Sequence, residues 1–415
     1  MDCVGNNLAV IADDLTGACD TACQFAQYGF TPEVVQSATW RDVHSQFLVY
    51  NSESRKDDAG AAQKKALDIA SALLRAHYLP FYKKLDSTLK GPWCAELAGV
   101  VGAVQAEITV VAPAFPAWGR TTVEGVQCVL GRPVWESRFH ALPHGDAAAE
   151  PGNLVQALQA QFGKRVRHFR RLSLKRGPAA LAKEMDAARF QGFPFLVFDA
   201  DADEDLKTIA LAGCRLERRI LWAGSGGLAR CLPLAWGLHP QQKEFHPSCP
   251  QALAINGSFN PANKEQLGYL EQAGVTVYWI EDEDAEDESR CRRKVESLLR
   301  TLEQGCDVAL SVRLSKPIRS AAHLQRLQDA LQFAAAECIA AVDNIGLILV
   351  GGDTAIKLYR NLRATAIRIE GEVQAGVPHG HWVGGRFDGQ PVVTKAGGFG
   401  QPDTLAKTVA FLKGS

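Results

Sequence analysis

Residues 7–29 of the chain read NLAVIADDLTGACDTACQFAQYG. The apolar run at residues 7–12 ends at the paired carboxylates Asp13 and Asp14. Alanines and Phe25 then recur at helical spacing until Gly29 ends the pattern. This order predicts a strand, a polar turn and a helix, which is the opening of an α/β domain.

The same alternation continues along the 415 residues, which are too many for one comfortable hydrophobic core. Further strands are expected at residues 47–50, 81–82, 108–111, 195–198, 220–222, 253–256, 308–312, 346–350 and 391–395. Between the strands expected at residues 220–222 and 253–256 lies GLHPQQKEFHPSCPQ at residues 237–251, a polar, proline-punctuated segment typical of a linker. We therefore expect two α/β domains, at residues 1–237 and 252–415, each a largely parallel sheet flanked by helices.

Composition excludes several functional classes. The 45 lysines and arginines balance 46 acidic residues, so no net field favours nucleic acid or a membrane surface. The eleven cysteines form no C-x-x-C pair or Cys/His cluster, and the N-terminus lacks the basic region of a secretion signal. We expect a cytoplasmic protein that acts on small molecules, with no nucleic-acid or membrane partner; a homo-oligomer remains open.

Three polar junctions follow strands in the first domain, where open α/β sheets bind ligands. At residues 13–17, two adjacent carboxylates can bind Mg²⁺, substrate hydroxyls or act as a base, although one of them can simply cap the helix. At residues 83–91, KKLDSTLKG surrounds a carboxylate and two hydroxyls with three cations, which favours anion binding over a solvated charged run. At residues 52–56, Arg55 suits a bidentate carboxylate contact, or is an ordinary surface arginine.

Glycine turns follow three strands in the second domain, at residues 257–258, 351–354 and 397–400. Glycine lets backbone N–H groups approach a phosphate closely, and the helix that follows adds a positive dipole end. One such turn is ordinary punctuation, but three in one domain favour a nucleotide.

Of the other known nucleotide-binding motifs, one is matched by a segment of the sequence. The chain has neither a G-x-x-x-x-G-K-[ST] loop nor the H-R-D and D-F-G motifs of protein kinases. Residues 224–229, GSGGLA, fit the G-x-G-x-x-A form of a dinucleotide fingerprint, but the linker stands where a following strand with an acidic residue is required. An NAD-dependent dehydrogenase is therefore a minor alternative.

Five motifs occur in order along the chain: IADDLTG at residues 11–17, KKLDSTLKG at 83–91, GRTTVEG at 119–125, GGDT at 351–354 and KAGGFG at 395–400. Together they closely resemble the four-carbon acid sugar kinase family over nearly the whole chain. The resemblance implies an N-terminal domain that binds a tetronate-type acid, such as a threonate, an erythronate or a 3-oxo-tetronate. It implies a C-terminal domain that binds ATP, used with Mg²⁺, and phosphorylation of the hydroxyl far from the carboxylate.

Carried over motif by motif, the resemblance assigns residues to two sites. The acid site would contain Asp13, Asp14, Arg55, Lys84, Asp86, Ser87, Thr88 and Lys90. The nucleotide site would contain Ser258, Gly351, Gly352, Asp353, Thr354, Gly397 and Gly398. Asp86 is favoured as the catalytic base because flanking cations should keep it ionised, and Asp14 is the alternative. No residue is assigned to a metal.

Departures from the family pattern fall in the substrate half. Lys90 and Pro92 stand where arginine and asparagine are usual, and the loop that contains Phe139 and His140 is altered. These changes leave the particular acid open. Lys90, together with Gln401 in place of a residue that is often acidic, keeps a catalytically silent sugar-acid sensor as an alternative.

Overall fold

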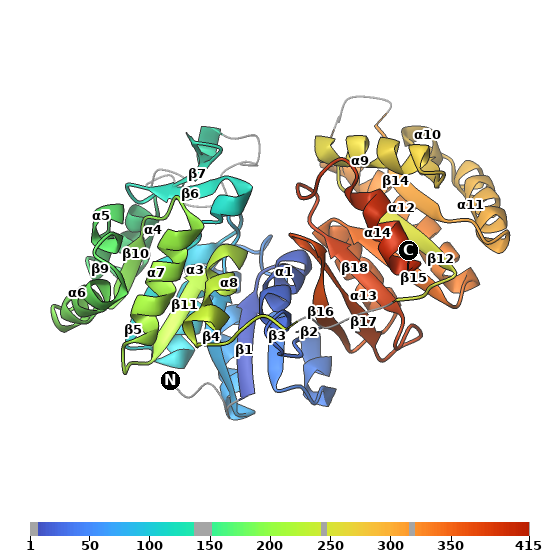
Figure 1. Cartoon of the computed structure of the whole chain (residues 1–415). Coiled ribbons are helices and arrows are strands. Elements are labelled where there is room, and N and C mark those ends of the chain that lie inside the picture. The colour runs from blue at the N-terminus through green and yellow to red at the C-terminus, as the bar shows by residue number, and fades with distance from the viewer. Residues whose placement is uncertain (1–6, 137–151, 242–246, 315–319, 415) are drawn as a thin grey trace. The chain divides into compact units, whose positions relative to one another are not determined.

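The computed structural model describes residues 7–136, 152–241, 247–314 and 320–414 (Figure 1). The chain forms two compact α/β units, Met1–Gln241 and Gln242–Ser415. Within the described ranges, no helix combines the length and the apolar character that crossing a membrane requires.

The first unit is built on eight parallel strands. In sheet order they are β2 (Glu33–Gln36), β3 (Phe47–Asn51), β1 (Asn7–Ala12), β4 (Tyr78–Lys84), β11 (Ile220–Gly224), β5 (Ile108–Ala112), β10 (Phe195–Phe198) and β9 (Val166–Phe169). β1 pairs with β3 on one side and β4 on the other, and all its residues after Asn7 are buried. Burial on both faces explains its unbroken apolar run.

Two helical layers cover this sheet. One contains α1 (Leu15–Ala26), α8 (Gly226–Ala235), α7 (Asp203–Cys214), α5 (Arg171–Leu174) and α6 (Pro178–Phe190); the other contains α2 (Ala59–Arg75), α3 (Trp93–Val104) and α4 (Leu154–Phe162). The connection from β1 runs towards one edge of the sheet and the connection from β3 towards the other, so right-handed crossovers place α1 and α2 on opposite faces. The carboxyl ends of β1, β3 and β4 therefore lie at a switch point, where such sheets bind ligands.

A small antiparallel sheet extends from the first unit. It contains β6 (Arg120–Val123), β7 (Val126–Val129) and β8 (Arg132–Pro133), with a bridge from Thr122 to Ala200. Short 3₁₀ helices lie at Ser37–Asp42, Pro116–Trp118 and Val134–Glu136. The GRTTVEG motif thus forms a hairpin, which the strand-helix alternation does not predict.

The second unit has a mixed sheet. In order its strands are β13 (Thr276–Ile280), β14 (Val308–Val312), β12 (Gln251–Asn256), β15 (Ile345–Val350), β18 (Pro391–Lys395), β17 (Val377–Val383) and β16 (Ala366–Gln374). The first five are parallel, whereas β17 is antiparallel to both of its neighbours. The expectation of a largely parallel sheet is confirmed, and the antiparallel strands β16 and β17 were not predicted.

Helices again form two groups around this sheet. α9 (Pro261–Gln272) packs on α14 (Thr404–Leu412), while α10 (Asp282–Glu286), α11 (Glu288–Glu303), α12 (Ala321–Ala341) and α13 (Gly352–Asn361) pack in succession. Leu267 and Leu270 of α9 and Leu405 and Leu412 of α14 join the apolar core over the strands. The carboxyl ends of the adjacent strands β12, β15 and β18 lead into the three glycine turns.

Candidate active site

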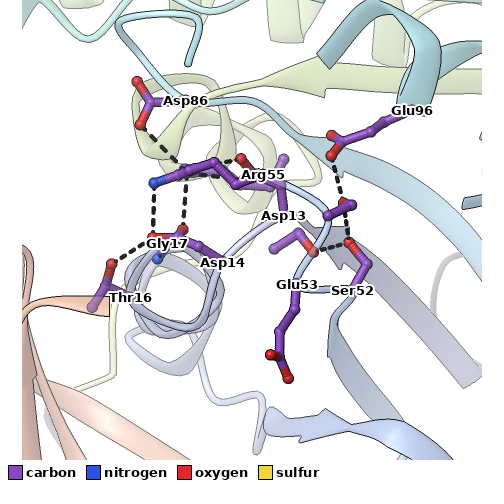
Figure 2. Close-up of polar contacts among 12 residues, drawn as sticks. Asp13, Asp14, Thr16, Gly17, Ser52, Glu53, Arg55, Asp86 and Glu96 are labelled. Carbon is purple, nitrogen blue, oxygen red and sulfur yellow. Dashed lines mark hydrogen bonds and ion pairs between the residues drawn. The ribbon is translucent and has the colours of Figure 1, made fainter. Parts of the chain in front are cut away.

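A guanidinium surrounded by three carboxylates lies beyond β1, β3 and β4 (Figure 2). Arg55 Nε and Nη2 donate to the two oxygens of Asp13 at 2.6 and 3.0 Å, and Nη1 and Nη2 donate to those of Asp14 at 2.8 and 3.0 Å. Asp86 Oδ2 lies 3.4 Å from Nη2. The structure thus brings together residues from three junctions that lie far apart in the sequence.

The paired aspartates differ in what else they bind. Asp14 is the N-cap of α1, because its Oδ1 accepts from the Gly17 N–H and its Oδ2 accepts from the Thr16 hydroxyl, both at 2.9 Å. Asp13 is almost fully buried and pairs with Arg55. Burial opposes the charge on Asp13, but Arg55 and nearby lysines outweigh it and lower its pKa. Capping and side-chain recognition are therefore combined in one dipeptide.

A buried polar network fixes the loop that carries Arg55. Lys83 Nζ lies 2.8 Å from Glu96 Oε2, and both side chains are almost fully buried. Ser54 donates to Glu96 Oε1 at 2.5 Å, and the hydroxyls of Ser52 and Ser54 are 2.7 Å apart. Breaking one partner would leave a buried charge uncompensated, so the network should be rigid. Lys83 therefore has a structural role, because its ammonium is engaged by Glu96 and a backbone carbonyl.

The loop at residues 86–91 folds back on Asp86. Asp86 Oδ1 accepts from the Thr88 N–H at 2.7 Å and from the Thr88 hydroxyl. Gly91 has φ 81°, and a Cβ there would stand 3.0 Å from the Arg55 carbonyl oxygen, so glycine is required. Burial would raise the pKa of Asp86, but Arg55, Lys90 and Lys84 outweigh it and hold that pKa well below its usual range. Asp86 is therefore ionised at neutral pH.

The other residues assigned to the acid site surround this cluster. Lys84 ends β4, is 5% exposed, and its Nζ would stand 3.0 Å from a Cβ on Gly17. Lys90 and Ser87 are half-buried on the loop that contains Asp86. Phe139 and His140 lie outside the described residues.

The three glycine turns of the second unit lie against one another. A Cβ on Gly397 would collide with Ser258 Oγ, and a Cβ on Gly257 would collide with Thr354 Oγ1. Gly351 has φ 99° and would place a Cβ 3.4 Å from Ser258 Cβ. Residues from the ends of β12, β15 and β18 therefore converge; close approach favours glycine at 257 and 397, and the positive φ favours it at 351.

The remaining nucleotide-site candidates lie on the same turns. Gly352 is the first residue of α13, with Asp353 in its first turn, and Gly398 is exposed on the turn after β18. Helix α13 thus directs its N-terminal N–H groups towards the edge of the sheet where the turns meet.

A buried lysine holds the last turn. Lys395 Nζ donates to Asn263 Oδ1 at 2.9 Å and to the carbonyls of Ala396 and Phe399 at 3.2 and 3.0 Å. Burial lowers the pKa of Lys395 to about 7. The sequence placed Lys395 in a motif without giving it a role, and its three bonds fix the backbone around Gly397.

Other residues of the protein fill the space beside the glycines of the G-x-G-x-x-A segment at residues 224–229. A Cβ on Gly226 would stand 2.6 Å from Asp20 Oδ2, and one on Gly227 would stand 2.6 Å from the Ala114 carbonyl. Ser225 caps α8 through the Gly227 N–H. These glycines let α8 pack closely on its neighbours, so the segment does not support the dehydrogenase alternative.

Two residues of the β6–β7 hairpin support the site and received no role from the sequence. Gln127 Nε2 donates to the Ser87 carbonyl at 2.7 Å, and its Oε1 accepts from the Thr122 hydroxyl at 2.7 Å. Burial lowers the pKa of Arg120, and the nearby charge of Asp86 partly offsets that effect. The GRTTVEG motif was the signal for these contacts, but spacing alone does not show that a hairpin returns to the loop at residue 87.

Known proteins resemble the chain over both units. Residues 8–232 match a sugar-binding N-terminal domain, and residues 253–405 match a nucleotide-binding C-terminal domain. D-threonate kinase of Salmonella typhimurium is 31% identical, with 98% of each chain covered. D-threonate kinase of Bordetella bronchiseptica is 31% identical, covering 99% of this chain and 98% of the relative. D-erythronate kinase of Heliobacterium modesticaldum is 25% identical, covering 98% and 97%.

Solved structures share the fold. A Salmonella typhimurium crystal structure superposes with a TM-score of 0.82 at 21% identity, covering 97% of this chain and 98% of that one. A Haemophilus influenzae crystal structure gives 0.74 at 20% identity, covering 98% and 100%. With family models and relatives that span both units, the chain belongs to the four-carbon acid sugar kinase family.

Proposed function

We propose that the protein transfers the γ-phosphate of ATP to the hydroxyl of a four-carbon sugar acid that lies farthest from its carboxylate. Relatives named D-threonate, D-erythronate and 3-oxo-tetronate kinase support this class of acceptor. The observation that carries the proposal is the cluster of Asp13, Asp14 and Asp86 around Arg55. It gathers acceptors for sugar hydroxyls at the ligand-binding edge of the first sheet.

Asp86 is better placed than Asp14 to receive the reacting hydroxyl. The oxygens of Asp14 already accept from Gly17, Thr16 and two Arg55 nitrogens. Asp86 Oδ2 has the 3.4 Å ion pair with Arg55 and retains lone pairs for a substrate hydroxyl. A lowered pKa makes Asp86 a weak base, which suits a loose phosphoryl-transfer transition state in which orientation of the acceptor matters most.

The glycine turns of the second unit support binding of ATP. Gly397 keeps space where a Cβ would meet Ser258, Gly351 adopts a positive φ, and the N-terminus of α13 favours phosphate. In the described ranges, no group of three or more His, Cys, Asp or Glu side chains is arranged to hold a metal ion. Mg²⁺ would therefore be held mainly by phosphate oxygens and water, and it would neutralise the charge that develops on the phosphates.

A substrate panel tests the proposal. ADP release and phosphorylated product are measured with ATP, Mg²⁺ and D-threonate, D-erythronate or 3-oxo-tetronate, with neutral tetritols as controls. We expect turnover with at least one acid and none with the tetritols. Tight acid binding without turnover would support the silent sensor instead, and failure to bind any acid would overturn the substrate class.

A further inference from the structure

Lys84 is a buried cation whose ammonium makes no hydrogen bond within the described residues. Its side chain is 5% exposed, and its ammonium donates to no residue in the described part of the chain. The adjacent Lys83 shows the contrast, because its Nζ lies 2.8 Å from Glu96 and donates to a backbone carbonyl. A buried ammonium with unused donors is costly. The charge of Lys84 acts on the nearby carboxylates of Asp13 and Asp86, but no described residue accepts a hydrogen bond from its ammonium.

The Lys84 ammonium faces the first turn of α1. A Cβ on Gly17 would stand 2.5 Å from Asp14 Oδ1 and 3.0 Å from Lys84 Nζ, so the ammonium lies beside this turn and close to the Asp14 carboxylate. Asp14 takes the N–H of Gly17, whereas the N–H groups of Leu15 and Thr16 make no hydrogen bond to the residues that the structure describes. A helix of 12 residues also presents the positive end of its dipole at this point. The lysine and the helix end together favour one anion.

Arg55, the other cation expected to bind a carboxylate, is already engaged. It donates four hydrogen bonds to Asp13 and Asp14 and lies 3.4 Å from Asp86. An anionic group that approached this guanidinium would meet three carboxylates before it met a free donor. The guanidinium therefore organises the carboxylates.

Taking the sugar-acid kinase activity proposed above as given, we propose that Lys84 and the N-terminus of α1 bind the carboxylate of the acid. Arg55 is then a positioning residue that holds Asp13, Asp14 and Asp86 towards the hydroxyls of the same molecule. A neutral analogue offers the Lys84 ammonium no charged acceptor, whereas a carboxylate can accept its hydrogen bonds. The subsite therefore makes the enzyme selective for acids over neutral compounds of the same shape.

Lys84→Met tests this assignment, because methionine keeps an unbranched chain and removes the charge. Binding of D-threonate, D-erythronate and their neutral primary amides is measured by calorimetry without nucleotide. Lys64→Met is the matched control, since Lys64 lies on α2 with its side chain 79% exposed. We expect Lys84→Met to weaken acid binding roughly 10- to 100-fold, as for a lost charged hydrogen bond, and to leave amide binding nearly unchanged. Lys64→Met should bind both as wild type does.

Retained amide binding also shows that the variant is folded. The subsite is wrong if Lys84→Met keeps the preference for acid over amide, or if it weakens both ligands equally. Measuring ATP turnover tests the proposed kinase activity independently of the carboxylate subsite. If acid binding depends on Lys84 but ATP is not turned over, the proposed kinase activity is wrong and the carboxylate subsite is supported. If acids are phosphorylated and the preference for acid does not depend on Lys84, the kinase activity is supported and the subsite is wrong.

Discussion

At the residue scale, the two candidate bases can be separated by one pair of substitutions. Asp86→Asn keeps the shape of the side chain and its contact with Thr88 but removes the acceptor charge, so kcat should fall about 10²- to 10⁴-fold. Asp14→Asn can still cap α1, and we expect a smaller loss of kcat. Steady-state kinetics at saturating ATP measures both. A larger loss in Asp14→Asn would make Asp14 the base.

Arg55 also determines how the site responds to acid. The lowered pKa values of Asp13 and Asp86 mean that the unfolded chain binds more protons at low pH. Their contribution to stability is present above the ordinary aspartate pKa of about 4 and is lost as the pH falls below it. Arg55→Lys keeps the charge but not the planar fork. It should lower the free energy of unfolding by about 1–3 kcal/mol near pH 7 and flatten its decline between pH 5 and 3.

Urea unfolding across this pH range measures both effects of Arg55→Lys. Lys65→Arg provides a control, because Lys65 pairs with Asp57 on the surface of α2 and lies outside the cluster. An Arg55→Lys protein with the stability and acid response of wild type would show that the carboxylates do not depend on the guanidinium.

At the scale of elements, the glycine turns of the second unit can be tested with a matched pair. Gly397→Ala places a Cβ against Ser258 Oγ and should raise the KM for ATP at least about tenfold by displacing the phosphate-binding backbone. Gly268→Ala lies inside α9 with no atom within 4 Å of the new Cβ, and should be neutral or slightly stabilising. If both variants bind ATP like wild type, the turn after β18 does not hold phosphate.

The elements also show how far sequence reasoning reaches. Strands β1, β10, β14 and β18 have the predicted bounds, because each is a short, unbroken run with clear ends. The run expected at residues 81–82 is the middle of β4, which begins at Tyr78 and ends with two lysines. Lysines in a strand interrupt the apolar run by which a buried strand is recognised. The local sequence does not show that Lys83 is paired with the buried Glu96. The sequence pattern also predicts no strand at β13, an edge strand of the second sheet in which only Ile280 is fully buried.

The residues that cluster around Arg55 could be singled out from their places after strands, but their partners could not. Sequence could name Asp13, Arg55 and Asp86, because each follows an apolar run. It could not show that one guanidinium holds three carboxylates, since these contacts join residues more than 30 positions apart. Long-range pairing depends on sheet order, and sheet order is a tertiary property.

At the scale of the whole molecule, the two units differ in the chemistry that they offer. The first gathers carboxylates and cations at one edge of its sheet, and the second gathers backbone N–H groups at glycine turns. A net charge of −1 adds no long-range field that would attract either ligand. Recognition therefore depends on these local sites, and each ligand should act through one unit.

We predict that this division appears as crossed effects on thermal stability. A ligand at about 100 times its Kd stabilises the native state by about 2.7 kcal/mol, which raises the Tm of a domain of this size by roughly 5–10 °C. A non-hydrolysable ATP analogue should therefore raise the Tm of wild type and of Lys84→Met, but much less that of Gly397→Ala. D-threonate or D-erythronate should stabilise Gly397→Ala as it does wild type, and Lys84→Met much less. NAD should stabilise none of them, because Gly226 and Gly227 are packed against Asp20 and Ala114. Stabilisation by NAD, or loss of both ligands in either variant, would contradict the separation of the two sites.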